Sequence, residues 1–293
     1  MPLKLYTHSF KVMGGPAELK IYFDNQAKNR AHIFALAEKE ARRLEQKYSR
    51  YLEDSITTKI NLSAGTPDGI IVDEETAGLL DYAQIAWEQS DGLFDITSGV
   101  LRKAWDFKSN KLPGTQYINK LLSHVGWQKL NWQNPVLFLP EKMEIDFGGV
   151  VKEYAADAIA ALLKQQGIKH GLVELAGDIS IVGPQPDNQP WKIGIRNPLK
   201  PTEAIATIDI VDGGIASSGN YERYMIINNK RYCHILNPKT GWPEQGISSV
   251  SVHTSTCLVA GTATTTALLL GAAQGREWLQ ASQFQHLLFE DSE

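Results

Sequence analysis

Residues 144–167 have the sequence EIDFGGVVKEYAADAIAALLKQQG, whose pattern of apolar residues changes partway along. Apolar residues at alternate positions over 143–147 predict a short strand. Gly148 and Gly149 break that pattern, and from Val151 the apolar residues follow a helical period. Gly167 is the expected C-cap of this helix. The predicted unit is therefore a strand, a glycine turn and a helix.

The turn in this unit has the chemistry of a phosphate site. Asp146 ends the strand, the glycine pair lets a ligand approach the backbone, and Lys152 lies in the first helical turn. A helix N-terminus adds unpaired N–H groups and a partial positive charge. The alternative is an ordinary strand–turn–helix without a ligand, which a glycine pair alone would favour.

Composition excludes some classes of protein. The chain has 293 residues, of which 29 are basic and 33 acidic, for a net charge of −4, and no Lys/Arg cluster stands out. This argues against binding to nucleic acid or to an anionic membrane surface. Cys233 and Cys257 are too few for a disulfide scaffold and wrongly spaced for zinc, although a single bridge between them stays open.

Nothing in the given chain predicts membrane insertion. No apolar stretch reaches membrane-spanning length, and residues 1–15 contain neither an apolar signal core nor a lipid-acceptor cysteine. We therefore expect a soluble cytoplasmic protein, unless a leader precedes this chain. The length suits one large domain, residues 1–293, with two intertwined lobes and no clear linker.

The remaining pattern predicts helices on an antiparallel sheet. Residues 3–23 predict a hairpin about the turn at 13–16, and residues 93–96 a short strand with Asp95 as a cap or turn former. Helices are expected over 31–48, 73–89, 258–270 and 276–280, and further strands over 172–175, 178–183, 191–198, 204–214, 224–227, 231–236 and 286–289.

Three features outside the opening stretch have two interpretations each. Tyr51, beside Arg50 in a polar loop, is either a packed edge residue or a stacking platform for an aromatic ligand. His234, near the end of a predicted hairpin, is either structural or catalytic. The threonines at 262 and 264–266 are poor helix formers, so we expect their hydroxyls to face something polar.

Motifs along nearly the whole chain resemble those of the FAD:protein FMN transferase (ApbE-like) family. They follow the family's order and are MGG (13–15), SRYLEDS (49–55), GLFDITSG (92–99), IDFGGVVKEYAAD (145–157), ELAGDISIVG (174–183), IASSGNYERY (215–224), HILNPKTGWP (234–243) and AGTATTTALLLG (260–271). Each motif alone is weak, whereas the ordered set is specific. The resemblance implies an α+β fold, an antiparallel sheet core with flanking helices in two lobes around a FAD cleft.

The resemblance also implies an activity. The family uses FAD and magnesium to transfer the FMN half of FAD onto a Ser or Thr hydroxyl of a target flavoprotein, releasing AMP. The expected partners are therefore FAD and an acceptor flavoprotein, with Mg²⁺ as the metal. Two alternatives use the same site: a FAD-binding protein without catalysis, and a FAD pyrophosphatase that gives FMN and AMP.

Site roles carry over from the family's motifs residue by residue. The family's flavin contacts fall on eight residues: Met13, Tyr51, Leu93, Phe94, Asp95, Asp146, Lys152 and Ile235. Its metal ligands fall on the Gly149 carbonyl and on Thr265. The expected catalytic residues are His234, beside the reacting phosphates, and Asp178, in the family's Gly-Gly-Asp stretch. Here Ala176 stands in place of the first glycine of that stretch.

Two further positions depart from the family pattern. Gly261 stands where the family's metal-site helix has an aspartate, and no acidic residue lies between Glu244 and Glu277. Because Mg²⁺ prefers anionic oxygen ligands, we expect it to bind more weakly here, and we expect Gly261→Asp to strengthen it. Glu153 stands where the family commonly has glycine, and places a negative charge near the phosphate end of the helix.

Overall fold

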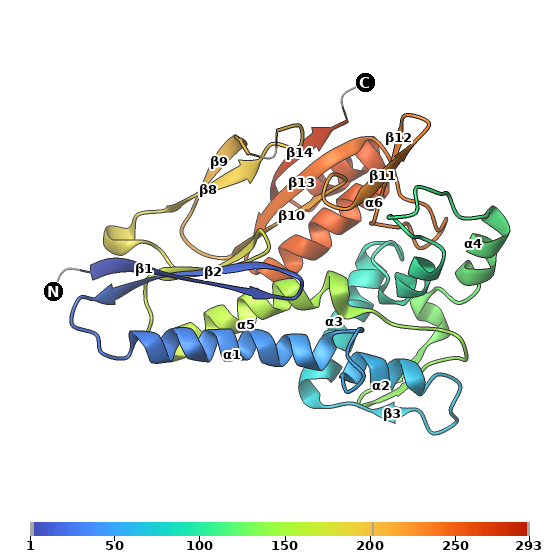
Figure 1. Cartoon of the computed structure of the whole chain (residues 1–293), viewed down its shortest axis with the longest axis horizontal. Coiled ribbons are helices and arrows are strands. Elements are labelled where there is room, and N and C mark those ends of the chain that lie inside the picture. The colour runs from blue at the N-terminus through green and yellow to red at the C-terminus, as the bar shows by residue number, and fades with distance from the viewer. Residues whose placement is uncertain (1–2, 201, 292–293) are drawn as a thin grey trace.

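A seven-stranded antiparallel sheet forms the centre of the protein, whose computed structural model describes residues 3–200 and 202–291 (Figure 1). The sheet confirms the α+β class with an antiparallel core. Its strands, in spatial order, are β1 (Leu3–Val12), β2 (Gly15–Asp24), β6 (Gly171–Leu175), β7 (Asp178–Gly183), β10 (Gly214–Gly219), β13 (Ile247–Thr254) and β14 (Gln285–Glu290).

Helices cover one face of this sheet. Helix α5 packs on β6 and β7, α6 packs on β10 and β13, and α1 packs on the outer side of α5 (Figure 1). The main hydrophobic core lies between these layers, with Val173 and Leu175 of β6 facing α5. The helices are α1 (Arg30–Tyr48), α2 (Ile56–Leu62), α3 (Glu74–Gln89), α4 (Thr115–Leu122), α5 (Val151–Gln165) and α6 (Cys257–Ala281).

A hairpin covers part of the opposite face. It consists of β8 (Trp191–Arg196) and β9 (Ala204–Ile210), which bury their apolar residues against those of β7 and β10, such as Ile179 and Ile215. Successive side chains of a strand point to opposite faces, so one sheet serves two cores. One smaller sheet consists of β3 (Ile70–Ile71), β5 (Val136–Phe138) and β4 (Asn131–Gln133), in that spatial order. Another consists of β11 (Tyr224–Ile227) and β12 (Lys230–Cys233).

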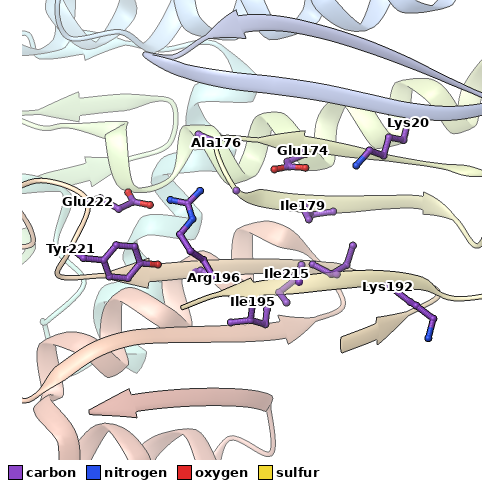
Figure 2. A pocket seen from close by; sticks show the side chains of 14 residues that line it. Lys20, Glu174, Ala176, Ile179, Lys192, Ile195, Arg196, Ile215, Tyr221 and Glu222 are labelled. Atoms are coloured by element: carbon purple, nitrogen blue, oxygen red, sulfur yellow. The ribbon is translucent and has the colours of Figure 1, made fainter. Parts of the chain in front are cut away.

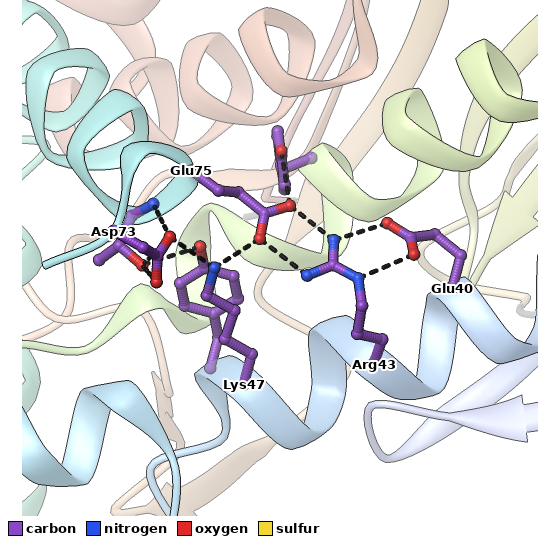
Figure 3. Close-up of polar contacts among 8 residues, drawn as sticks. Glu40, Arg43, Lys47, Asp73 and Glu75 are labelled. Carbon is purple, nitrogen blue, oxygen red and sulfur yellow. Dashed lines mark hydrogen bonds and ion pairs between the residues drawn. The ribbon is translucent and has the colours of Figure 1, made fainter.

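An ion-pair cluster fastens α1, α3 and α5 together (Figure 3). Arg43 and Lys47 of α1 both bind the Glu75 carboxylate of α3, at N···O distances of 2.6–2.9 Å. Tyr154 of α5 donates to the same carboxylate at 3.0 Å. The hydrogen bonds from Arg43 lead the effects that lower the pKa of Glu75 to about 2. The cluster therefore holds the helix that carries Lys152 and Glu153 in place.

Most predicted elements are confirmed, and two predicted strands are wrong. Residues 143–146 form no strand, because the Asn61 side chain takes both backbone groups of Ile145, at 2.7 and 3.0 Å, and, among the described residues, only the Asp146 N–H bonds to another backbone segment, at Ile96. Residues 93–96 form no strand either. The Asp95 side chain caps a 3-10 helix, η1 (Ile96–Lys103), as its expected role as a cap or turn former implies. Alternating polarity alone could not distinguish these buried loops from strands.

Helix α6 corrects one expectation. It is long and apolar enough to cross a membrane by length and composition, although no stretch was expected to reach that length. In its most apolar window 56% of the residues are buried inside the protein. The two helices expected around 258–270 and 276–280 are joined across Gly271, whose φ of 76° interrupts the helical backbone. Within the described chain, Cys233 and Cys257 are both free thiols.

Candidate functional site

The turn before α5 exposes its glycines. A short 3-10 turn, η3 (Phe147–Gly149), precedes the helix, and Gly148 and Gly149 are exposed. The Asp146 Oδ1 accepts a hydrogen bond from the Gly148 N–H at 2.9 Å and so fixes the turn. Among the described residues no side chain caps the N-terminus of α5. Backbone donors at this helix end are thus available to an anion.

Lys152 of α5 and Asp178 of β7 form an ion pair at the end of the sheet. Asp178 is only 2% exposed and also accepts a hydrogen bond from the Ser217 N–H at 3.2 Å. Burial acts to lower the pKa of Lys152, but the charges of Asp178 and Glu153 and the hydrogen bond to Asp178 together outweigh it and raise that pKa. Lys152 therefore remains a cation beside the open helix end.

His234 follows β12 and lies among cations. Its backbone N–H donates to the Arg223 carbonyl at 3.0 Å, and its ring Nδ1 has no hydrogen-bond partner in residues 3–200 and 202–291. Burial, followed by the charges of Arg223, Arg102 and Lys152, lowers the pKa of His234 to about 4. At pH 7 the ring is neutral and can accept a proton, in surroundings whose positive charge suits a phosphate.

Tyr51 projects from its loop with 76% of its surface exposed, so it is not a packed edge residue. Its hydroxyl accepts a hydrogen bond from Arg102 at 3.2 Å. Arg102 and Arg50 bind the Asp146 carboxylate at 3.2 and 3.1 Å. These contacts connect the tyrosine loop to the turn before α5 and leave the ring free for a stacking partner.

Arg50 and Arg102 are two site residues that the sequence analysis did not assign, and Arg223 beside His234 is a third. Arg50 had a signal, because it stands beside Tyr51 in the motif SRYLEDS. Arg102 had none, because its position follows from η1, whose irregular path has no periodic pattern in the sequence. Both contact Asp146, which alone would be an uncompensated charge at a site for an anionic ligand.

Leu93, Phe94 and Asp95 lie beneath the site rather than at its surface, each less than one tenth exposed. A Cβ at Gly149 would lie 3.8 Å from the Phe94 ring, so this ring supports the glycine turn from below. The Asp95 carboxylate accepts hydrogen bonds from Thr97 at 2.7 and 2.8 Å, and one from a backbone N–H at 2.9 Å. Its oxygens are therefore engaged within the protein.

The hairpin turn at Met13 adjoins the turn that leads to Asp178. A Cβ at Gly15 would lie 2.6 Å from the Ala176 Cβ, which shows how closely the two turns pack. Ala176 has a φ of 51°, a left-handed conformation that glycine adopts without strain. Met13 is fixed by a hydrogen bond from its N–H to Glu45 Oε1 at 2.6 Å. Ile235 is half-buried next to His234.

Three of the four hydroxyls of α6 face polar groups, as expected, whereas Thr266 Oγ1 is buried without a hydrogen-bond partner among the described residues. Thr262 Oγ1 lies 2.7 Å from the Tyr82 hydroxyl, and Ser218 Oγ lies 2.9 Å from Thr264 Oγ1 and 3.4 Å from Thr265 Oγ1. Glu153 of α5 is directed at the same helix, and burial raises the pKa of its carboxyl to about 7. Oxygen donors from α5, α6 and β10 thus converge beside the open end of α5.

A hollow of about 200 Å³ lies on the opposite face of the sheet, between β7, β10 and the β8–β9 hairpin (Figure 2). Its lining includes charged side chains, among them Glu174, Arg196 and Glu222. The hollow reaches the candidate site only at its edge, through Gly177 and Ser217, which adjoin Asp178. The reactive groups described above are therefore not inside it.

The structure brings five of the predicted residues together around the start of α5: Asp146, Gly149, Lys152, Asp178 and His234. Thr265 stands across from them on α6. Within residues 3–200 and 202–291, no group of three or more His, Cys, Asp or Glu side chains has the arrangement of a metal site. A metal here would need hydroxyl, carbonyl or substrate oxygens in addition to carboxylates.

Known proteins resemble this chain in both sequence and structure. The sequence profile of the ApbE family matches residues 13–288. A FAD:protein FMN transferase of Salmonella typhimurium is 31% identical over 247 residues, which cover 78% of this chain and 68% of that protein. The crystal structure of the ApbE protein from Thermotoga maritima superposes with a TM-score of 0.88 at 28% identity, covering 98% of this chain and 94% of that one.

A second solved structure supports the fold alone. The flavinyl transferase ApbE of Pseudomonas stutzeri, in its apo form, has a TM-score of 0.87 at 24% identity. The match covers 99% of this chain and 92% of that one. The fold is thus shared over nearly the whole chain.

Proposed function

Since this chain belongs to the ApbE family of flavin transferases, we propose that it transfers the FMN half of FAD onto a Ser or Thr hydroxyl of an acceptor flavoprotein. The acceptor oxygen attacks the phosphorus on the riboflavin side of the FAD pyrophosphate. A P–O bond to the acceptor forms, the bond to the bridging oxygen breaks, and AMP leaves. The hydroxyl proton goes to a base of the enzyme.

One observation carries this proposal: the buried Nδ1 of His234 has no hydrogen-bond partner within the described part of the chain, and burial together with the charges of three nearby cations lowers the pKa of its ring. A pyrophosphate needs positive charge around it as it reacts, which Lys152, Arg102 and Arg223 supply. The acceptor hydroxyl needs a base that is unprotonated at neutral pH, which is the state of His234. The lowered pKa of His234 and the charge of these cations support His234 as the base.

Other residues would bind and orient FAD. The exposed ring of Tyr51 is suited to stacking on the isoalloxazine or adenine ring, and Ile235 adds an apolar surface next to His234. The N-terminus of α5, with its exposed glycines, is suited to a phosphate oxygen. Asp178 positions Lys152 through their ion pair.

The donor set around α5 fits a hard divalent cation. Thr265 offers a hydroxyl and Gly149 an exposed backbone, and these oxygen donors, together with pyrophosphate oxygens, are of the type that Mg²⁺ binds. When bound, Mg²⁺ would neutralise charge on the pyrophosphate. The protein's own residues orient the substrate and accept the proton.

Incubation with FAD, Mg²⁺ and a candidate acceptor flavoprotein tests the proposal. Transfer places flavin covalently on the acceptor, and replacing its target Ser or Thr with Ala must abolish the labelling. FMN released into solution would instead identify a pyrophosphatase, and unchanged FAD would identify a non-catalytic binder. Either of these results, with an acceptor that a related enzyme does modify, would refute the transferase.

A further inference from the structure

Glu153 is a buried carboxylate with an unsatisfied oxygen. It lies in the first turn of α5 and is 8% exposed. Its Oε2 has no hydrogen-bond partner in the part of the chain that the structure describes. Its Oε1 is 3.8 Å from Lys152 Nζ, which already pairs with Asp178. A buried carboxylate normally has its oxygens satisfied, so this one has the chemistry of a group that completes its contacts with a ligand.

Gly261 on α6 makes the position of this carboxylate possible. A Cβ at 261 would lie 2.6 Å from Glu153 Cγ and 3.0 Å from Glu153 Oε1. Any side chain at 261 would therefore occupy the space that Glu153 takes. A glycine within a helix lowers the stability of the helix by about 1 kcal/mol relative to alanine. At position 261 the glycine leaves the space in which the Glu153 side chain approaches α6.

The carboxylate lies against the face of α6 that carries Thr265. Positions 261 and 265 are one turn apart and share a face of the helix. Thr265 Oγ1 is 3.4 Å from Ser218 Oγ, a distance at which its hydroxyl is not firmly held. Glu153 and Thr265 thus present a carboxylate and a hydroxyl on the same side of the α5–α6 contact, next to the Lys152–Asp178 pair.

We infer that Glu153 supplies the carboxylate of a divalent-cation site, from α5, in the space that a side chain at position 261 of α6 would otherwise fill. The cation is of the Mg²⁺ class, because the donors are hard oxygens. The inference rests on the proposed function insofar as the cation accompanies FAD. It reverses the expectation that this site lacks a carboxylate, and it makes Gly261→Asp alone harmful, since two carboxylates would compete for one space.

An exchange of the two positions tests this inference. The full-length variants are Glu153→Gln, Glu153→Gly, Gly261→Asp and the double change Glu153→Gly with Gly261→Asp. Mg²⁺ binding is measured by calorimetry and Mn²⁺ binding by EPR, with FAD and without acceptor. Glu277→Gln removes one charge from an exposed position of α6 and is the matched control. Circular dichroism checks folding in each case.

Glu153→Gln and Glu153→Gly should weaken Mg²⁺ and Mn²⁺ binding by at least about tenfold, and Glu277→Gln should leave it unchanged. The double variant should regain affinity relative to Glu153→Gly, because the carboxylate returns from α6. Wild-type affinity in folded Glu153→Gln would overturn the inference. So would a double variant that binds no better than Glu153→Gly, which keeps the test decisive if the glutamine variant does not fold.

These outcomes are separable from the fate of the proposed function. A wild type that transfers FMN while Glu153→Gln binds Mg²⁺ equally well would refute the role of Glu153 and leave the transferase in place. The converse result is that Glu153→Gln weakens Mg²⁺ binding while the wild-type protein modifies no competent acceptor. That result would refute the transferase and support the cation site.

Discussion

The low pKa of His234 makes the acid limb of the pH profile the most informative test of the proposed base. An ordinary histidine with a pKa near 6.5 would be about 9% neutral at pH 5.5. With the pKa of about 4 that burial and nearby cations give His234, about 97% of the ring would be neutral at that pH. With Mg²⁺ saturating at every pH, so that protonation of Glu153 does not limit the rate, FMN transfer should therefore retain nearly its full kcat/KM at pH 5.5.

The assay is kcat/KM for FAD between pH 4 and 8, because this quantity reports groups of the free enzyme. His234→Ala should lower the transfer rate by about 10²–10⁴-fold with FAD affinity nearly unchanged, and should remove the acid limb. His32, exposed on α1, is the matched control. An acid limb near pH 6.5 in the wild type, or an equal loss of binding and rate in His234→Ala, would refute the argument.

The same shift has a consequence for stability. A histidine whose pKa is lower in the folded than in the unfolded state binds fewer protons in the native state. The stability that neutral His234 contributes is therefore fully present above about pH 6.5 and is lost as the pH falls toward 4. The free energy of unfolding should decline by up to about 3 kcal/mol over this window. His234→Ala should flatten the decline in urea titrations at each pH, whereas His32→Ala should not.

Three further predictions concern the ligand and the helix cluster. Calorimetry should show that FAD binds clearly more tightly than FMN, and equal affinities would remove the dinucleotide from the proposal. Tyr51→Ala should weaken FAD binding by about 1–3 kcal/mol. Tyr51→Phe keeps the ring and loses only the hydrogen bond with Arg102, so it should retain most of the FAD affinity. An unchanged Kd in Tyr51→Ala would argue against stacking. Glu75→Gln should lower the free energy of unfolding by about 1–2 kcal/mol at pH 7, after allowance for solvent screening. Because the pKa of Glu75 is lowered to about 2, this difference should be complete above pH 4.5 and disappear as pH falls through 2, and the exposed Glu74→Gln should show none of it.

The fold could be predicted from the sequence wherever period and turn chemistry agreed. The hairpin of β1 and β2 has a turn with φ values of 52° and 76° at Met13 and Gly14, which suits the expected glycine turn. Helix α5 begins at Val151 and is followed by Gly167 with a φ of 82°, as its C-cap pattern predicts. Both features depend on residues close together in the chain.

The predicted strands failed where a distant side chain replaced a strand partner. Residues 143–146 have the alternation of a strand, but the amide of Asn61, more than eighty residues earlier, takes the hydrogen bonds of Ile145. Residues 93–96 are ordered by the Asp95 cap and by Trp127. No local pattern reveals such long-range partners.

The candidate site shows the same division. Lys152 and His234 could be chosen from their motifs, but the neutrality of His234 follows from burial and from Arg102 and Arg223, which a sequence does not place. The ion pair between Lys152 and Asp178 joins two elements whose separation only the fold defines. The residue types of Lys152 and His234 thus predicted a cation and a base, but whether each side chain is charged depends on its tertiary contacts.

Gly261 and Glu153 show why two departures from a pattern can be misjudged when each is weighed alone. Gly261 by itself indicates a lost ligand, and Glu153 by itself indicates an unfavourable charge beside a phosphate site. In the structure the Glu153 side chain lies against Gly261, so each residue explains the other: the glycine leaves room, and the glutamate fills it with a carboxylate. Because 108 positions separate them in the chain (261 minus 153), only their contact reveals one rearranged site rather than two defects.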